Sequence, residues 1–495
     1  MLDKSRIEAL RNAPVAPALH LIDGVARPAS DGGIMEVLSP LDGKPLTTMA
    51  RGTAADAHAA IAAARRAFED GCWSGLAPAA RKAVLLRWAT LIERDALELA
   101  VLGVRNNGTE IGMALKAEPL SAAATIRYYA EATDKIYGEI APTGDDVLGL
   151  VHRAPVGVVG AIVPWNFPLM IGTWKLGPAL AAGNTVVLKP AETASLTLLR
   201  LAELALEAGM PPGVFNVVLG EGAVVGEAMS LSPEIDVIVF TGSGGVGRRL
   251  LENAARSNLK RVYLELGGKS PNIVFADAPS LDEAVKVSAN GIFRNAGQVC
   301  VAGSRLLVER SIHDAFVEKL AAFSATMKVG DPLDPASAAG AVNSLRQLEQ
   351  NLRFVDEARA QGRKVVLGGR RILEETGGYF MEPTIITGVG PDDPIAQREV
   401  FGPVLAVIPF DTEEEVLRIA NGTDYGLAAA VWTGSLSRAH RMVRAIRAGV
   451  VHVNTYGGSD LTVPLGGVKQ SGNGHDKSLH AFDKYLDLKT AWIKL

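Results

Sequence analysis

A cysteine close to a glycine is the first residue whose type suggests chemistry. Cys300 follows Gly297, Gln298 and Val299, and a glycine allows a substrate to approach the backbone closely. A thiol must ionise to act as a nucleophile, and its ordinary pKa of about 8.5 leaves little thiolate at neutral pH. The eight histidines show no arrangement that pairs one of them with Cys300. A small buried cysteine without reactivity is therefore the alternative.

An amide side chain lies in a rigid loop that follows an expected strand. Pro164 and Pro168 restrict the backbone, and Asn166 stands between Trp165 and Phe167. A preorganised amide N–H can stabilise the oxyanion that forms when a nucleophile attacks a carbonyl group. The alternative is an aromatic loop that only packs on the core.

A glycine-rich turn after a strand predicts a nucleotide site. Gly242, Gly244 and Gly247 fit the pattern G-x-G-x-x-G between a strand ending at Phe240 and a helix. Such glycines let the backbone approach a pyrophosphate, and the N-terminus of the helix attracts the negative charge. A glycine-rich turn without a ligand is the alternative. Gly267 to Ser270 resemble a phosphate-binding P-loop, but Tyr263 replaces the first glycine that this motif requires.

Glu265 has two possible roles. It lies 18 residues after Gly247, close to the spacing of about 20 at which a Rossmann fold places a ribose-binding carboxylate. Lys189 and Glu192, at the end of an earlier strand, offer a second ribose site. If the ribose binds there, Glu265 is free for catalysis, and spacing alone does not decide between the two.

These residues require a scaffold of alternating strands and helices. The early chain reads as helical, and short apolar runs alternate with helices from residue 158 onward, which favours a parallel sheet covered on both faces. A second alternating stretch runs from residue 272 to about 453. We expect helices at 54–69, after Pro78, and at 120–136, 195–208 and 246–255, and strands at 158–163, 185–188, 215–219, 237–240 and 261–264.

Composition excludes several functions. The 495 residues carry a formal net charge of −4, with no basic run that would suggest nucleic acid. Only Cys72 and Cys300 occur, so we expect no disulfide framework and a cytoplasmic location. No secretory signal, membrane-spanning run or paired metal-ligand motif is visible, and we expect no membrane or metal partner.

Taken together, the motifs resemble the aldehyde dehydrogenase superfamily, in that family's order and over nearly the whole chain. They are Pro164–Pro168, Lys189–Glu192, Phe240–Ser243, Glu265–Lys269, Gly297–Cys300, Glu399–Pro403 and Pro464–Gly467.

The resemblance implies an α/β fold with three parts. A Rossmann-like NAD-binding domain would comprise residues 1–136 and 159–267, and a second α/β catalytic domain residues 268–470. A small β element for oligomerisation would comprise residues 137–158 and 478–495. A homodimer or homotetramer would then form through pairing of the segment near 137–158 with the C-terminal strand at 490–495.

The resemblance also implies a mechanism. The Cys300 thiolate would attack an aldehyde, and the Asn166 amide with the Cys300 N–H would hold the oxyanion. Hydride transfer to NAD would leave a thioester, which a water activated by Glu265 would hydrolyse. The presence of Glu265 argues against the branch of the family that transfers the acyl group to coenzyme A.

NAD is the expected cofactor. Lys189 and Glu192 would hold the adenine ribose, and the carboxylate of Glu192 would repel the 2′-phosphate of NADP. Glu399 and Phe401 would position the nicotinamide ribose. The full expected set is Ile162, Val163, Pro164, Trp165, Lys189, Glu192, Gly222, Gly226, Phe240, Gly242, Ser243, Val246, Leu266, Glu399 and Phe401.

The substrate is expected to be an ω-amino aldehyde from polyamine catabolism, of the γ-glutamyl-γ-aminobutyraldehyde or guanidinobutyraldehyde type. Residues 134–139, 436–441 and 471–480 resemble that branch. Asp460 is the candidate partner of the amino group, with Glu118 as a weaker one; the alternatives are a solvated loop aspartate and a helix residue that faces water. The expected tunnel residues are Phe167, Trp174, Val299, Val301 and the loop 456–465, which includes Leu465.

The chain departs from the family pattern at three places, one of which is a pair of glycines. Leu465 replaces a phenylalanine, which reduces one aromatic wall of the tunnel. Asn106 replaces an aspartate that can belong to a monovalent-cation site. Gly244 and Gly245 replace bulkier residues in the phosphate turn.

Other functions remain open from the sequence alone. Cys300 and Glu265 would also suit an esterase or thioesterase without a cofactor, although Lys189, Glu192 and Glu399 would then have no role. A dehydrogenase for simple aliphatic or aromatic aldehydes is a further alternative, and so is a non-catalytic relative.

Overall fold

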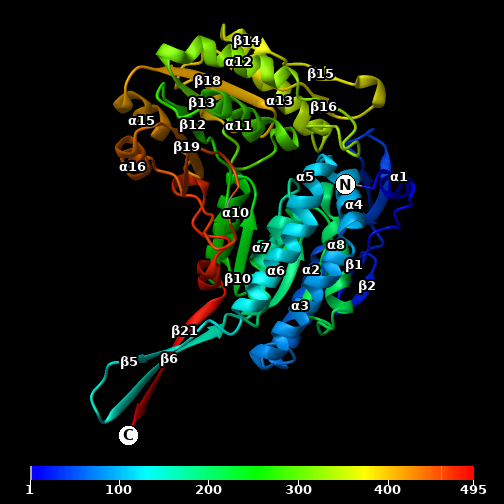
Figure 1. Ribbon diagram of the computed structural model, residues 1–495. Coiled ribbons are helices and arrows are strands. Elements are labelled where there is room, and N and C mark those ends of the chain that lie inside the picture. The colour runs from blue at the N-terminus through cyan, green and yellow to red at the C-terminus, as the bar shows by residue number, and fades with distance from the viewer. Residues whose placement is uncertain (1–2, 459) are drawn as a thin grey trace.

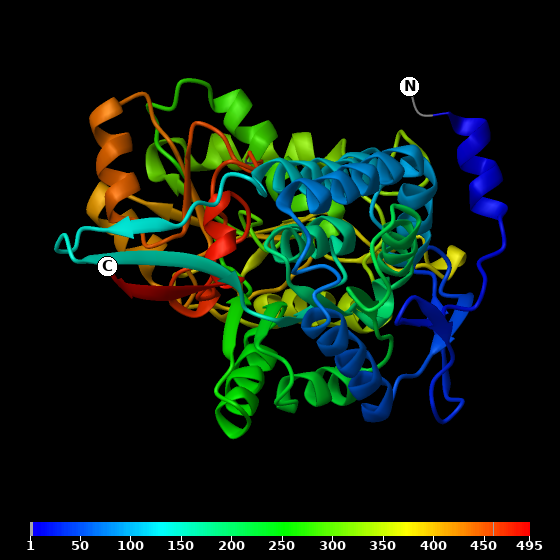
Figure 2. The same cartoon turned by 90° about the horizontal axis from the view of Figure 1, so that it is seen from below.

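Two seven-stranded sheets and a projecting three-stranded arm make up the molecule (Figure 1). The computed structural model describes residues 3–458 and 460–495. It confirms the expected α/β class, with helices packed against both sheets (Figures 1 and 2).

The first sheet has the order β11-β10-β7-β8-β9-β1-β2. The five strands from β11 to β9 in this order are parallel to one another, whereas β1 is antiparallel to both β9 and β2. All five strands expected from the sequence are present, with ends that differ by at most two residues. Every residue of β7 and β8 is buried, because helices cover both faces of the sheet. The bounds are β1 His20–Ile22, β2 Val25–Arg27, β7 Val158–Ile162, β8 Thr185–Lys189, β9 Phe215–Val217, β10 Val237–Thr241 and β11 Arg261–Glu265.

Two layers of helices cover this sheet, and neighbouring strand residues point into opposite layers. Val159 packs in the core formed with α3, α6, α7 and α8, whereas Val158 packs in the core formed with α2, α9 and α10. The expected helices are confirmed, although α6 ends at Ala132 rather than near residue 136. The bounds are α2 Ala54–Glu69, α3 Pro78–Arg94, α6 Ser121–Ala132, α7 Pro168–Ala181, α8 Leu196–Glu207, α9 Glu227–Leu231 and α10 Gly244–Arg256.

Some N-terminal elements were not expected from the sequence. The helices α1 and α4 pack against each other, and two short hairpins precede α2. The bounds are α1 Lys4–Asn12, β3 Ile34–Leu38, β4 Pro45–Ala50, α4 Ala96–Asn107 and α5 Ile111–Leu115, followed by a π-helical turn at Lys116–Leu120.

The second sheet has the order β14-β17-β18-β13-β12-β19-β20. The six strands that follow β14 in this order are parallel to one another. The edge strand β14 is antiparallel to its neighbour β17. The strand bounds are β12 Pro271–Val274, β13 Arg305–Glu309, β14 Lys364–Leu367, β17 Thr384–Thr387, β18 Val404–Phe410, β19 Ala428–Trp432 and β20 Val450–Val453. The main helices are α11 Leu281–Phe293, α12 His313–Ala325, α13 Leu345–Ala360, α15 Glu413–Asn421 and α16 Leu436–Ala445.

The arm carries the C-terminus at its tip (Figure 1). Strand β21 (Leu486–Lys494) pairs antiparallel with β6 (Val147–Pro155), which also pairs with β5 (Glu139–Ala141). The expected pairing of these two segments is thus confirmed, and β21 begins four residues earlier than expected. Trp492 is 68% exposed and Leu488 is 67% exposed, so the arm presents apolar surface in the single chain.

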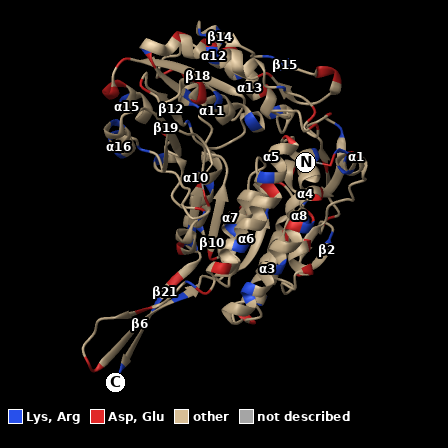
Figure 3. Cartoon of the chain, viewed as in Figure 1, with Lys and Arg blue, Asp and Glu red and all other residues tan. Residues whose placement is uncertain are grey.

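Charged residues of both signs are interspersed along the chain (Figure 3). Within residues 3–458 and 460–495, no helix is both long and apolar enough to cross a bilayer.

Candidate active site

A cavity of about 270 Å³ lies where the carboxyl ends of the first sheet meet the second-sheet part of the chain. It brings together residues that are far apart in the sequence. The loop after β7, the turn after β10 and the cysteine segment all contribute. The lining residues are Pro164, Trp165, Asn166, Ile171, Thr241, Gly242, Ser243, Leu266, Gly267, Cys300, Gln347, Gln350, Glu399 and Phe401.

Cys300 reaches this cavity from a turn with unusual backbone conformations. Asn295 and Ala296 have φ values of 50° and 49°, and Gly297 follows with a φ of 71°. A Cβ atom on Gly297 would lie 2.1 Å from the backbone oxygen of Gly402, so only glycine fits there. Gly297 is therefore needed so that the cysteine segment can pack closely against the backbone of Gly402.

Asn166 is buried beside the cysteine segment. Its Nδ2 donates to the backbone oxygen of Gln298 over 2.9 Å, and its own carbonyl accepts from Asn295 over 3.3 Å. An amide nitrogen carries two N–H donors, and one of them is used in this contact. The side chain is held rigidly where it lines the same cavity as Cys300.

Glu265 is the last residue of β11 and lies near a buried charged cluster. Its Oε1 is buried without a hydrogen-bond partner among the described residues. Behind it, Asp476 accepts from both Lys175 and Lys484, and all three side chains are buried. Burial raises the pKa of Glu265 well above its ordinary value, and Asp476 acts in the same direction, whereas the two lysines oppose it.

The Cys300 thiol is held in its neutral form. Burial raises the pKa of Cys300 to about 12, and the charges of Glu399 and Glu265 contribute in the same direction. A thiol in this setting needs a base and a compensating charge to become a nucleophile. A carboxyl group with a raised pKa, such as Glu265, is a stronger base than an ordinary carboxylate.

The expected cofactor residues follow one edge of the first sheet. Ile162, at the end of β7, lies opposite Lys189 of β8 on one side and opposite Phe240 of β10 on the other. The Lys189 Nζ lies 2.8 Å from Glu192 Oε1, which also accepts from the Gly222 N–H over 2.6 Å. Dinucleotides bind across the carboxyl ends of parallel strands, which is where these residues lie.

The Glu399 side chain packs against the backbone of Gly267 and Gly268, which follow β11. The Gly268 N–H donates to its Oε1 over 2.9 Å, and a Cβ atom on Gly267 would lie 2.0 Å from its Oε2. Burial raises the pKa of Glu399 to about 7. Phe401 has a φ of 58° and packs edge-on against Trp165 at 5.2 Å between ring centroids.

The remaining cofactor positions surround the same edge. Val163 and Leu266 are buried, Gly226 packs toward Ile162, and Val246 is 46% exposed on the first turn of α10. Ser243 precedes α10 without a side-chain cap, and Thr241 Oγ1 is buried without a partner among the described residues. These unused polar groups fit a pyrophosphate-binding turn.

None of the expected tunnel residues is among the residues that line the cavity. Phe167 is buried, Val299 packs against an apolar core of the second sheet, and Leu465 pairs with Asp476 through its backbone. The Val301 oxygen accepts from the Tyr456 hydroxyl over 2.6 Å. Trp174 lies three residues after Ile171, which does line the cavity, and therefore shares its face of α7.

The two candidate carboxylates for an amino group differ in setting. Asp460 is exposed, and its Oδ1 accepts from the backbone and hydroxyl of Thr462 over 2.8 and 2.7 Å. Ser459, in the same loop, lies outside the described residues. Glu118 does not face water, so that alternative is wrong: its carboxylate is buried, accepts from the Met170 N–H over 2.9 Å, and has its pKa raised to about 8 by burial.

Asn106 caps a helix instead of facing a ligand. Its Oδ1 accepts from the Leu196 N–H over 3.2 Å, at the start of α8, and its Nδ2 donates to the Thr193 oxygen over 3.4 Å. The described residues contain no group of three or more His, Cys, Asp or Glu side chains that could hold a metal ion.

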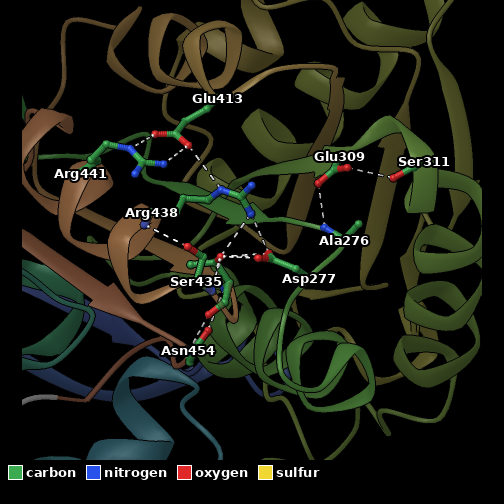
Figure 4. Close-up of polar contacts among 10 residues, drawn as sticks. Ala276, Asp277, Glu309, Ser311, Glu413, Ser435, Arg438, Arg441 and Asn454 are labelled. Atoms are coloured by element: carbon green, nitrogen blue, oxygen red, sulfur yellow. Dashed lines mark hydrogen bonds and ion pairs between the residues drawn. The ribbon is translucent and has the colours of Figure 1, made fainter.

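A polar network fixes the base of the loop that follows β20 (Figure 4). Asn454 accepts from the Thr433 N–H over 2.9 Å and donates to the Thr433 oxygen over 3.1 Å. The Thr433 hydroxyl donates to Asp277, which pairs with Arg438 at 2.8 Å. Arg438 also lies 4.3 Å from the centroid of the Phe275 ring. The network therefore ties the loop to β12, β19 and α16.

Five residues of the cavity lining were not predicted. Ile171 follows Phe167 at helical spacing, so the helical period could have indicated it as a lining residue. Thr241 and Gly267 lie within the motifs Phe240–Ser243 and Glu265–Lys269. Gln347 and Gln350 come from α13, and nothing in the sequence connects that helix with the site. Gln347 donates to the backbone oxygens of Val400 and Phe401 and so supports the Glu399 segment.

A known protein family matches nearly the whole chain. The profile described as "Aldehyde dehydrogenase family" matches residues 27–491. The chain belongs to the aldehyde dehydrogenase family. The NADP/NAD-dependent aldehyde dehydrogenase PuuC of Escherichia coli (strain K12) is 49% identical over 474 residues, which cover 96% of this chain and 95% of that protein.

Several solved aldehyde dehydrogenase structures match the whole chain. An indole-3-acetaldehyde dehydrogenase in complex with NAD+ is 51% identical, with a TM-score of 0.98 and 100% of both chains covered. A gamma-glutamyl-gamma-aminobutyraldehyde dehydrogenase from Burkholderia cenocepacia J2315 is 50% identical, with the same TM-score and coverage.

Proposed function

We propose that this chain oxidises an ω-amino aldehyde to the carboxylic acid with NAD, through a covalent thioester on Cys300. The observation that carries the proposal is the shared cavity of Cys300, Asn166 and Glu399 beside the glycine-rich turn. Glu265 lies close enough for its charge to raise the pKa of the thiol. The NAD-binding part would comprise residues 1–136 and 159–267, and the catalytic part residues 268–470.

The first step is attack by the sulfur of Cys300 on the aldehyde carbon. Because burial holds the thiol neutral, its proton must leave to a base, and Glu399 and Glu265 are both nearby carboxylates with raised pKa values, so the thiol can still lose its proton to Glu399 when Glu265 is replaced. The C–S bond forms as the carbonyl double bond becomes an oxyanion. The Asn166 amide and the Cys300 backbone N–H are placed to donate to that oxygen.

The residues at the sheet edge fit a dinucleotide. Lys189, Glu192 and the turn Gly242–Gly247 would hold the adenosine and phosphate groups, while Glu399 and Phe401 would hold the nicotinamide ribose. NAD, when bound, accepts the hydride that the aldehyde carbon loses. The Trp165 and Phe401 rings and the buried Leu266 exclude water from this side of the cavity.

Hydrolysis of the thioester is assigned to Glu265. A carboxylate whose pKa is raised by burial can remove a proton from water near neutral pH. The water oxygen then forms a bond to the acyl carbon, and the C–S bond breaks as the acid leaves. The cluster of Lys175, Asp476 and Lys484 holds compensating charge behind Glu265.

The substrate class rests on relatives and on one loop residue. Relatives near 50% identity include an enzyme named for gamma-glutamyl-gamma-aminobutyraldehyde and one named for indole-3-acetaldehyde. Asp460, an exposed carboxylate in the loop after β20, would bind the ammonium group of an ω-amino aldehyde. We favour this class because an ammonium group would give that carboxylate a charge-assisted hydrogen bond, whereas an indole ring has only a neutral N–H to offer.

Oligomerisation is proposed through the arm. The strand β21 has a free edge, and Leu488, Trp492 and Ile493 are exposed on it. Exposed apolar strands are unfavourable unless another chain covers them. We therefore propose a homodimer or homotetramer. The cytoplasmic location expected from the two free cysteines stays a prediction.

The proposal is tested by NADH formation with purified protein. The panel is γ-glutamyl-γ-aminobutyraldehyde, 4-guanidinobutyraldehyde, 4-aminobutyraldehyde, propanal and benzaldehyde. We expect the highest kcat/KM with the ω-amino aldehydes. A preference for propanal or benzaldehyde would overturn the substrate class, and no NADH or NADPH from any aldehyde would overturn the dehydrogenase assignment.

A further inference from the structure

Glu110 is a buried carboxylate beside the nucleophile turn, Arg294–Gly297, which precedes Cys300. It is 2% exposed and stands directly before α5. Its Oε1 and Oε2 accept from the Asn295 backbone N–H over 3.3 and 3.2 Å. Asn295 and Ala296 have left-handed φ values, which are unfavourable for residues other than glycine and persist only where surrounding contacts hold them. Glu110 supplies such a contact.

Asn295 connects the nucleophile turn with the loop that carries Asn166. Its Nδ2 donates to the Asn166 backbone oxygen over 3.3 Å and to the Gln298 backbone oxygen over 3.4 Å. Its Oδ1 accepts from the Thr109 hydroxyl over 2.8 Å. The Asn166 Nδ2 donates to the same Gln298 oxygen over 2.9 Å. A shift of Asn295 would therefore move the Asn166 amide relative to Cys300.

The segment from Asn107 to Glu110 holds both of these parts. The Asn107 Nδ2 donates to the Trp165 backbone oxygen over 3.4 Å, and its Oδ1 accepts from the Thr109 N–H over 3.1 Å. The side chains of Asn107, Thr109 and Glu110 belong to residues that are at most 3% exposed. One buried segment thus contacts the loop that carries Asn166 through Trp165, and contacts the nucleophile turn through Thr109 and Glu110.

The Glu110 carboxylate is surrounded by backbone donors. Burial raises the pKa of Glu110 to about 7. Its own backbone N–H and those of Asn295 and Gly340 bind the carboxylate and act in the opposite direction, as does the charge of Arg294. A buried carboxyl group is unfavourable unless donors bind it. Because the three N–H groups come from three separate segments, the carboxylate joins these segments at one point.

We propose that Glu110 is a positioning residue for the oxidation. It holds the Asn295 turn so that the Asn166 amide and the Cys300 backbone N–H face the same oxyanion. The two donors come from the loop after β7 and the segment after α11, and stabilisation of an oxyanion depends closely on their relative placement. Glu110 acts through Asn295 and transfers no proton itself. This inference rests on the proposed function, because it concerns the oxyanion site of that reaction.

The test measures NADH formation in a single turnover, with enzyme and NAD in excess over the aldehyde of the panel that has the highest wild-type kcat/KM. This rate reports attack by Cys300 and hydride transfer, and it excludes thioester hydrolysis. Glu110→Leu should lower the rate about ten- to hundredfold, the range for displaced reacting groups. Glu131→Leu, at an exposed glutamate on α6, is the matched control and should keep the wild-type rate.

Glu110→Gln should give a smaller loss than Glu110→Leu. The amide keeps one acceptor oxygen, but its NH2 group must face one of the three N–H donors that the carboxylate binds. Glu110→Gln should therefore lie between the wild type and Glu110→Leu. This variant also provides the test if Glu110→Leu does not fold.

The Asn166→Ala background separates positioning from a general effect on the fold. If Glu110 acts through the oxyanion site, its substitution should lower the single-turnover rate of Asn166→Ala much less than that of wild type, as a double-mutant cycle shows. An equal loss in both backgrounds would overturn the inference, and so would a wild-type rate in the Glu110 variant that folds. Absence of NADH from every aldehyde with wild type would instead overturn the proposed function itself.

Discussion

The backbone N–H of Gly242 donates to the carbonyl oxygen of Glu265 over 3.0 Å. Glu265 is the last residue of β11, and Gly242 directly follows the neighbouring parallel strand β10, in which Thr241 lies opposite Glu265. The glycine-rich turn and the candidate base therefore leave the first sheet at the same edge. This register explains how one edge can bind a dinucleotide and also place a carboxylate beside Cys300.

Glu265→Gln should separate the two halves of the reaction. The amide cannot remove a proton from water, so acyl-enzyme should accumulate and kcat should fall about 10²- to 10⁴-fold. The measurement is rapid-mixing NADH formation, in which a burst should precede slow turnover. Glu252→Gln, an exposed glutamate on α10, serves as the control and should show wild-type turnover. A normal kcat in Glu265→Gln would contradict the assignment of the base.

The activity should rise with pH. The pKa values of Cys300 and Glu265 are both raised by burial, and the reactive form of each is the deprotonated one. The reactive fraction therefore increases as pH increases, and kcat/KM should climb as the pH rises from neutral into the alkaline range. In Glu265→Gln the part of the rise that Glu265 contributes should disappear. A profile that falls over this range would show that neither group is needed in its ionised form.

The sequence predicted the elements and residues that depend on local pattern. Five strands of the first sheet were found because buried parallel strands are continuous apolar runs, as in Val158–Ile162. Gln347 and Gln350 could not be found, because tertiary packing alone brings α13 to the Cys300 cavity. One alternative for Glu118 was a side chain that faces water, because a glutamate on a helix usually does. Its carboxylate instead accepts from Met170 at the start of α7, a tertiary contact that the local pattern does not show.

Glu192→Gln should relax the choice of cofactor. The carboxylate of Glu192, bonded to Lys189 and the Gly222 N–H, would repel a 2′-phosphate. Its removal should raise kcat/KM with NADP relative to NAD by about tenfold. Glu221→Gln, an exposed neighbour, should change this ratio little. If Glu192→Gln leaves the ratio at the wild-type value, Glu192 does not contact the ribose.

Asp476→Asn should destabilise the fold. The change leaves Lys175 and Lys484 buried without a counter-charge, which costs about 3–5 kcal/mol. Thermal unfolding of variant and wild type gives the comparison. Asp483→Asn, with an exposed side chain, should cost less than about 1 kcal/mol. Equal stability of the Asp476→Asn variant and wild type would contradict a buried ion cluster.

Asp476 should also make the stability of the fold depend on pH in the acid range. Burial alone would raise the pKa of Asp476, but Lys175 and Lys484 hold it below the ordinary value. The stabilisation by Asp476 is then complete above the unfolded pKa of about 3.9 and is lost as pH falls through the lower folded value. Asp476→Asn should lose this part of the acid dependence of the unfolding temperature, and an identical acid profile would argue against it.

Trp492→Asp should weaken self-association. Trp492 is 68% exposed on β21, and a charge there would have to be buried when a second chain covers the arm. Light scattering after size exclusion should show a smaller assembly than wild type. Leu436→Asp, at an equally exposed apolar residue on α16, should keep the wild-type mass. An unchanged mass for Trp492→Asp would place the interface elsewhere.

The covalent role of Cys300 is tested most directly by trapping the acyl-enzyme. The Glu265→Gln variant is mixed with NAD and γ-glutamyl-γ-aminobutyraldehyde, quenched in acid and analysed by peptide mass spectrometry. The account predicts an acyl group on the peptide that contains Cys300, in proportion to the NADH burst, and neither signal when Cys300→Ala is added to the variant. A burst of NADH that persists without Cys300, or one that leaves no acyl group on its peptide, would contradict the account.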